Sequence, residues 1–154
     1  MLAAMSLCSV TAQAASWKFF NSYAETAVFF FDSDTIVKKN DTVTLWEQLV
    51  QEENTPASDG SYSAVQRDVY NCKERTVQLL TAVTYDKSHQ PIRTYPSGGV
   101  LDVVPDSMGE ARLKEVCAGN FPKNYNQVYN NDVYTAANDV FSFLKIAKKN
   151  PAPK

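Results

Sequence analysis

The stretch RTVQLLTAVTY at residues 75–85 decides the fold, because it has the clearest two-residue alternation in the chain. Val77, Leu79, Val83 and Tyr85 fall on one face of an extended strand, and threonine and glutamine side chains lie mainly on the other. One apolar face and one polar face are typical of an antiparallel sheet. We therefore expect this stretch to be a strand with one face turned inward and the other exposed to water.

Further strands are expected on both sides of this stretch. The strands expected at 17–23 and 26–31 carry apolar residues on both faces, so each is covered on both sides or packs against a partner. In 42–51 the alternation is imperfect, which is typical of a bulge near Trp46. The expected strands are 17–23, 26–31, 42–51, 64–72, 91–95 and 100–104.

Two helices are expected after the strands. Ser107 and Glu110 have the spacing of a capping box, and Gly119 can end this first helix in a left-handed cap. The segment 121–154 has five lysines and two aspartates, hence a charge of +3, and it contains a second, amphipathic helix. One stripe of that helix holds Val133, Ala137, Val140, Phe141 and Leu144.

Residues 1–14 resemble an export signal. They carry no charge, and a short apolar stretch is followed by Ala12-Gln13-Ala14, the small-x-small pattern that a signal peptidase cuts. The alternative is a buried N-terminal strand or helix. The predicted organisation is a signal peptide at 1–14, a domain at 15–120 and a helical extension at 121–154.

Cleavage after this signal removes Cys8 and leaves Cys72 and Cys117. An even number of cysteines in an oxidising compartment favours a disulfide, which we predict between these two. Two buried free thiols and a metal pair are the alternatives, although the sequence has few other soft ligands. The predicted fold class is α+β: a mainly antiparallel sheet of about six strands with a disulfide-tethered helix and a C-terminal amphipathic helix.

The composition excludes several classes of function. The chain has 154 residues, a net charge of −2 and a pI near 5.4, so it lacks the basic face that a general nucleic-acid binder needs. No apolar run is long enough to span a bilayer. With His89 as the single histidine, we assign no catalytic residue, no metal site and no cofactor, and we expect no enzyme.

A partner surface is the remaining candidate. Most of the aromatic rings belong in the core, but Phe29 and Phe31 in an early strand leave room for a contact with another protein. The stripe residues Val140, Phe141 and Leu144 form a second candidate surface, although packing on the chain's own sheet is the simpler interpretation. The sequence is also compatible with a homodimer.

Several motifs together resemble the surface-adhesin protein E family of bacteria over about residues 17–118. The motifs are Trp17, Phe29 to Asp32 with Ile36, Val43 to Trp46, Tyr70 to Arg75, and Cys117 at the end of a short helix. The resemblance implies a small exported sheet domain with one helix and one disulfide, associated with the outer membrane. It also implies a host matrix or plasma protein as partner, such as vitronectin, laminin or plasminogen, and it assigns no binding residue.

The expected function is therefore that of an exported bacterial binding module, adhesin-like and non-catalytic, at the cell surface, in the periplasm or outside the cell. The alternative is a structural or accessory subunit of an envelope or extracellular assembly.

Overall fold

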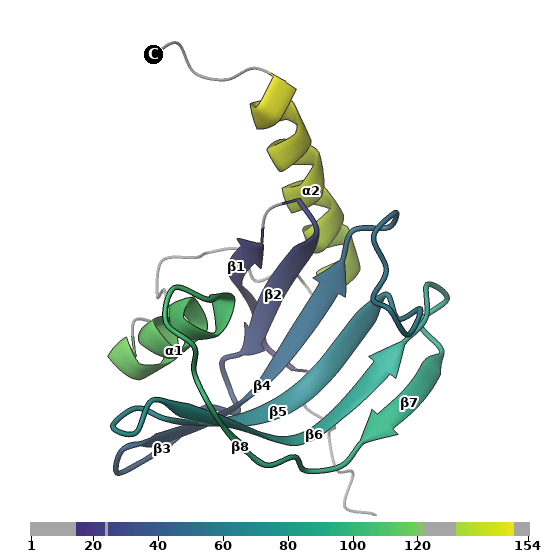
Figure 1. The fold of residues 1–154 in the computed structure, drawn as a ribbon. Coiled ribbons are helices and arrows are strands. Elements are labelled where there is room, and N and C mark those ends of the chain that lie inside the picture. Colours follow the sequence, from purple (N-terminus) through teal and green to yellow (C-terminus); the bar gives the residue numbers. More distant parts are fainter. Residues whose placement is uncertain (1–14, 24, 120, 122–131, 150–154) are drawn as a thin grey trace, which may run out of the picture.

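The structure is a computed structural model that describes residues 15–23, 25–119, 121 and 132–149. The expected signal peptide lies outside these residues. The described chain forms a sheet with the order β1-β2-β4-β5-β6-β7, in which β3 also pairs with β4 and β8 with β6 (Figure 1). The strands are β1 (Trp17–Tyr23), β2 (Ala27–Asp32), β3 (Val37–Lys39), β4 (Thr42–Gln51), β5 (Ser63–Asn71), β6 (Thr76–Tyr85), β7 (Pro91–Tyr95) and β8 (Val100–Asp102). The helices are α1 (Met108–Ala118) and α2 (Val133–Lys149).

The predicted fold class is confirmed. Every neighbouring pair of strands is antiparallel, and both helices lie where they were expected. The described part of the chain has eight strands against the expected six or so. Seven of them, the short β8 included, correspond to expected stretches, and β3 is an additional short strand that pairs with β4.

The two helices cover opposite faces of the sheet. The α1 face carries Phe31, Leu45 and Tyr70, which pack against Leu113 and Val116 of α1. The α2 face carries Val28, Phe30 and Val50, which pack against the buried side chains of α2. Residues opposite each other in a ladder share a face, and Val28 pairs with Val50 while Phe31 pairs with Glu47. The apolar residues on both faces of β2 are thus explained by a helix on each side.

The bulges do not lie where the sequence suggested. The register of β4 with β5 is continuous from Thr42 to Val50 and passes through Trp46 without a shift, so the expected bulge there is wrong. The sheet instead has an irregularity in β6, where Asp68 pairs with Leu79 and Arg67 pairs with Thr81. The extra residue at this point is Leu80, and it reverses the faces of the residues that follow.

This reversal changes the faces of the 75–85 stretch. Val77 pairs with Tyr70 and so lies on the α1 face, whereas Val83 pairs with Val65 and lies on the α2 face. The expectation of one apolar face along the whole strand is therefore wrong beyond Leu80. After the bulge, Ala82 lies on the α1 face, and it helps to form the groove described below.

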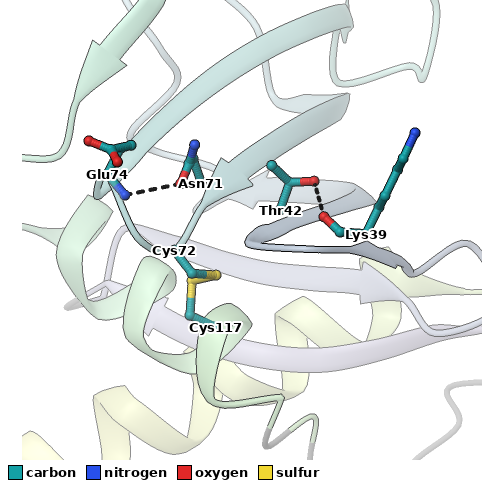
Figure 2. The surroundings of a disulfide bond; sticks show 6 residues. All are labelled: Lys39, Thr42, Asn71, Cys72, Glu74 and Cys117. Atoms are coloured by element: carbon teal, nitrogen blue, oxygen red, sulfur yellow. Dashed lines mark hydrogen bonds between the residues drawn. A yellow bond between two sulfur atoms is a disulfide. The ribbon is translucent and has the colours of Figure 1, made fainter.

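A disulfide joins Cys72, just after β5, to Cys117 in the last turn of α1 (Figure 2). Their Cα atoms are 5.5 Å apart, and the bond closes 45 residues of chain. The predicted bond is thus present, and α1 is tied to the sheet at its C-terminal end. In the chain-entropy model a loop of this length stabilises the folded state by about 4 kcal/mol.

Both ends of α1 have caps. The Ser107 hydroxyl accepts a hydrogen bond from the Glu110 N–H, and Gly119 ends the helix with φ of 63°. The second hydrogen bond of the expected capping box is shifted by one residue. The Glu110 carboxylate accepts from the N–H of Asp106, whereas a capping box predicts the N–H of Ser107. The same carboxylate forms an ion pair with Arg75 from the turn between β5 and β6. This pair is a second link between α1 and the sheet.

Candidate functional site

The side chains on the α1 face change character along the strands. In β4 the residues on this face run from Leu45, under α1, through Glu47 to Leu49. In β5 they run from Tyr70 through Asp68 to Gln66 and Ala64. An apolar core, a buried ionic cluster and an open groove therefore follow one another across the same face.

The ionic cluster is centred on Arg112 of α1. Its guanidinium contacts the carboxylate of Glu47, lies 3.5 Å from Asp68 Oδ2, and sits over the ring of Phe29 with 4.9 Å to the centroid. The Tyr70 hydroxyl donates to Glu47 at 3.0 Å. Glu47 is 1% exposed and Asp68 3%, so both carboxylates are closed to solvent, while the Arg112 side chain is 16% exposed.

Burial has a large effect on the titration of this cluster. Loss of hydration, together with the hydrogen bond and the charge of Glu47, raises the pKa of Asp68 to about 7. Burial likewise raises the pKa of Tyr70 well above its ordinary value. The cluster therefore holds a proton that an exposed aspartate would release, and Asp68 is protonated in part of the molecules at neutral pH.

The groove begins where the ionic cluster ends. Gln66 connects the two, because its Nε2 donates to Asp68 Oδ2 while its side chain lines the groove. The hollow has a volume of about 360 Å³ and lies over β4, β5 and β6, with the loop between β4 and β5 as one wall. Its lining residues are Leu49, Gln51, Ala57, Ser58, Asp59, Ser61, Ala64, Gln66, Leu79, Ala82, Thr84 and Tyr95.

The groove has an apolar floor and a mostly uncharged polar rim. Alanines and leucines form the floor, and amide and hydroxyl groups surround it. Asp59 is the one ionisable carboxylate among the described lining residues, and its Oδ2 accepts a hydrogen bond from the Tyr95 hydroxyl at 3.0 Å. This bond ties the loop to the last residue of β7. A pocket of this size and lining can bind an apolar or amphipathic group.

A second hollow of about 330 Å³ lies at the start of α2. There His89 stacks on Tyr134 with 3.7 Å between ring centroids, and Tyr134 stacks on Tyr62 at 6.0 Å. The Tyr134 hydroxyl also bonds Ser63. Because these contacts attach α2 to the sheet, the single histidine has a packing role in this position. Within the described residues there is no group of three or more potential metal ligands, and no helix is long and apolar enough to cross a membrane.

The residues expected to form a partner surface have different environments. Phe31 is 1% exposed in the core under α1, and Phe141 is 3% exposed in the core under α2. Phe29, Val140 and Leu144 are partly buried. A partner surface at these positions stays a prediction, and the side chains able to form it are the three that are partly buried.

Sequence reasoning missed two exposed apolar residues on α2. Phe143 is 69% exposed and Ile146 60%. They lie three residues apart and outside the stripe that packs on the sheet, and the end of α2 projects beyond the strands (Figure 1). The ionic cluster was missed as well. The sequence feature that indicates this cluster is an acidic residue where the alternation of the strand calls for an apolar one. It occurs in two neighbouring strands, at Glu47 in β4 and Asp68 in β5.

Comparison with known proteins identifies the family. The family model described as surface-adhesin protein E matches residues 17–118, which include every strand and α1. The chain belongs to the surface-adhesin protein E family. The resemblance seen in the sequence motifs is thus confirmed, and α2 lies outside the matched residues.

Solved structures of this surface-adhesin family give a weaker likeness. A structure of Haemophilus influenzae protein E is 18% identical with a TM-score of 0.45, over 75% of this chain and 93% of that one. A second crystal form is 17% identical with a TM-score of 0.46, over 75% and 98%. Protein E from non-typeable Haemophilus influenzae is 14% identical with a TM-score of 0.46, over 90% and 96%. No curated protein matches the chain significantly.

Proposed function

We propose that this protein is an exported, non-catalytic binding module that recognises protein partners at the cell surface or in the envelope. The observation that carries the proposal is the groove on the α1 face. It is open to solvent, has an apolar floor, and is held by strands on one side and a tethered loop on the other. Membership of a surface-adhesin family supports a binding role. The disulfide supports export to an oxidising compartment.

The chemistry of the groove supports a non-catalytic role. Its described lining holds no histidine, cysteine or lysine that could act with Asp59 as a nucleophile or a general base. The carboxylate with the raised pKa, Asp68, is a typical candidate for acid-base catalysis. However, it is 3% exposed and lies behind Gln66, so a substrate in the groove does not reach it.

A binding assay tests the proposal. The oxidised protein is applied to immobilised vitronectin, laminin and plasminogen, and its binding is measured by biolayer interferometry. A Ser58→Trp variant adds a ring at the exposed rim of the groove, and a Lys73→Trp variant adds the same ring at the exposed turn after β5. We expect at least one of the three proteins to bind, with affinity lost in Ser58→Trp and kept in Lys73→Trp. Binding to none of them would contradict the proposal.

One observation favours the alternative of an assembly subunit. Phe143 and Ile146 expose apolar side chains in the C-terminal half of α2, and exposed apolar side chains of this kind are common at protein contacts. Deletion of 121–154 is a poor test, because it would also uncover the core in which Phe141 is buried. The double variant Phe143→Ser and Ile146→Ser leaves that core intact. If it releases the protein from an envelope complex, the assembly role is favoured.

A further inference from the structure

The single carboxylate of the groove is held in a fixed position. Asp59 Oδ1 accepts from the backbone N–H of Ser61 at 3.0 Å, and Oδ2 accepts from the Tyr95 hydroxyl at the same distance. Hydrogen bonds from Ser61, through its hydroxyl and its N–H, and from Tyr95 lower the pKa of Asp59. The carboxylate is therefore ionised at every pH near neutrality.

No cation of the described chain neutralises this charge. The nearby Arg93 sits over the ring of Tyr95, 5.8 Å from the centroid, and it forms no ion pair with Asp59. Arg112 is occupied by Glu47 and lies in the buried cluster. In the described structure, the negative charge of Asp59 is thus held in a fixed position, and no basic side chain of the described residues pairs with it.

The floor beside Asp59 is apolar and hollow. The small side chains of Ala64 and Ala82 lie next to Leu79 in β5 and β6, and they leave the space that the groove occupies. A long alkyl chain can lie on such a surface while its charged end stays in contact with water and with a carboxylate. Lysine and arginine are the protein side chains that have both parts.

We propose that the groove receives a lysine or arginine side chain of the protein partner. The alkyl stem lies on Leu79, Ala64 and Ala82, and the cationic group meets the carboxylate of Asp59. This inference rests on the proposed function, because it assumes a protein in the groove. It specifies the occupant as a basic side chain, and not an acidic or purely apolar one. Because the ion pair is exposed, we expect it to increase the affinity for a basic side chain only about fivefold over that for an uncharged one.

Three blocked peptides test the proposal directly. They have the form acetyl-Gly-Gly-X-Gly-Gly-amide, with X as lysine, arginine or norleucine, which keeps an alkyl stem without the charge. Each is titrated into the ¹⁵N-labelled oxidised protein, and the amide signals of Ser61 and Ala82 are followed. We expect the lysine or the arginine peptide to shift both signals and to bind about fivefold more tightly than the norleucine peptide. Equal binding of all three peptides, or no shift at Ser61 and Ala82, would overturn the proposal.

A matched pair of variants isolates the charge. Asp59→Asn keeps an oxygen that can accept from Ser61 but removes the charge, and Asp102→Asn removes an exposed charge in β8, outside the groove. Far-UV circular dichroism checks that both fold. We expect Asp59→Asn to reduce binding of the basic peptide to the level of norleucine, and Asp102→Asn to leave it unchanged. Undiminished binding by Asp59→Asn would overturn the proposal.

The same two variants separate this proposal from the proposed function. If the wild-type protein binds a host protein and Asp59→Asn binds it equally well, the basic occupant is wrong and the binding function stands. If the wild-type protein binds no host protein, the proposed function fails, and the peptide titration still decides whether the groove prefers a basic side chain.

Discussion

The buried carboxyl group of Asp68 makes the stability of this protein depend on pH in an unusual direction. Most acidic groups in folded proteins have a lowered pKa, so they stabilise the fold above their unfolded pKa. Asp68 has a pKa raised to about 7 from 3.8, mainly because burial removes its hydration. The contribution of Asp68 to the free energy of unfolding is therefore fully present below pH 4, and it is lost as the pH rises through 7.

The substitution Asp68→Asn removes this titration and keeps the shape. The asparagine oxygen can accept from Gln66, and its amide can donate to Glu47, as a protonated aspartate does. With pKa values of 3.8 and about 7, the linkage relation gives a change of about 2–3 kcal/mol between pH 5 and pH 8. We expect the wild-type free energy of unfolding to fall by this amount relative to the variant over that range.

Urea unfolding without reductant measures both proteins at several pH values from 5 to 8, with tryptophan fluorescence as the signal. Taking the difference between wild type and variant cancels the contributions of the other titrating groups, such as Glu52 and Glu110, whose pKa values are lowered by their hydrogen bonds. Parallel profiles for the two proteins would refute the reasoning, and so would a difference that grows in the opposite direction.

Three further predictions concern stability and can be checked by the same urea titration. Replacing Cys72 and Cys117 together by serine should cost about 4 kcal/mol, because the unfolded chain regains its freedom; a loss below 1 kcal/mol would contradict this. Phe141→Ala should cost about 3–5 kcal/mol, because it leaves a cavity under α2, whereas Phe143→Ala, on the exposed flank, should change stability by less than about 0.5 kcal/mol. Similar effects of the two phenylalanines would contradict the placement of α2. Ser107→Ala should cost about 1 kcal/mol, because the Glu110 N–H loses its acceptor; an unchanged midpoint would argue against this cap.

The fold was largely predictable because its determinants are local. Alternation placed the strands, and Ser107 and Gly119 placed the ends of α1. The bulge at Leu80 was not predictable, since Val77 and Leu79 before it and Val83 and Tyr85 after it keep the same two-residue spacing. The face of the sheet on which each β6 side chain lies depends on how β6 pairs with β5. The sequence of β6 alone does not determine that pairing.

The candidate site was harder to predict, because its residues meet only in the folded chain. Arg112 lies in a helix rich in charged residues and looks like a solvated side chain. Its burial is decided by Glu47 and Asp68, which belong to two strands more than forty positions earlier. The groove depends on Ala64 and Ala82, whose small size has no sequence signal of its own.

Photo-cross-linking on intact cells tests most directly whether the groove is where partners bind. p-Benzoyl-phenylalanine is placed at Ser58, on the exposed rim of the groove, or at Phe143, on the exposed flank of α2. Cells carrying either version are exposed to serum and irradiated, and the adducts are identified by mass spectrometry. Binding through the groove predicts an adduct with a host protein from Ser58 and none from Phe143. An adduct with an envelope protein from Phe143, and none from Ser58, would contradict it.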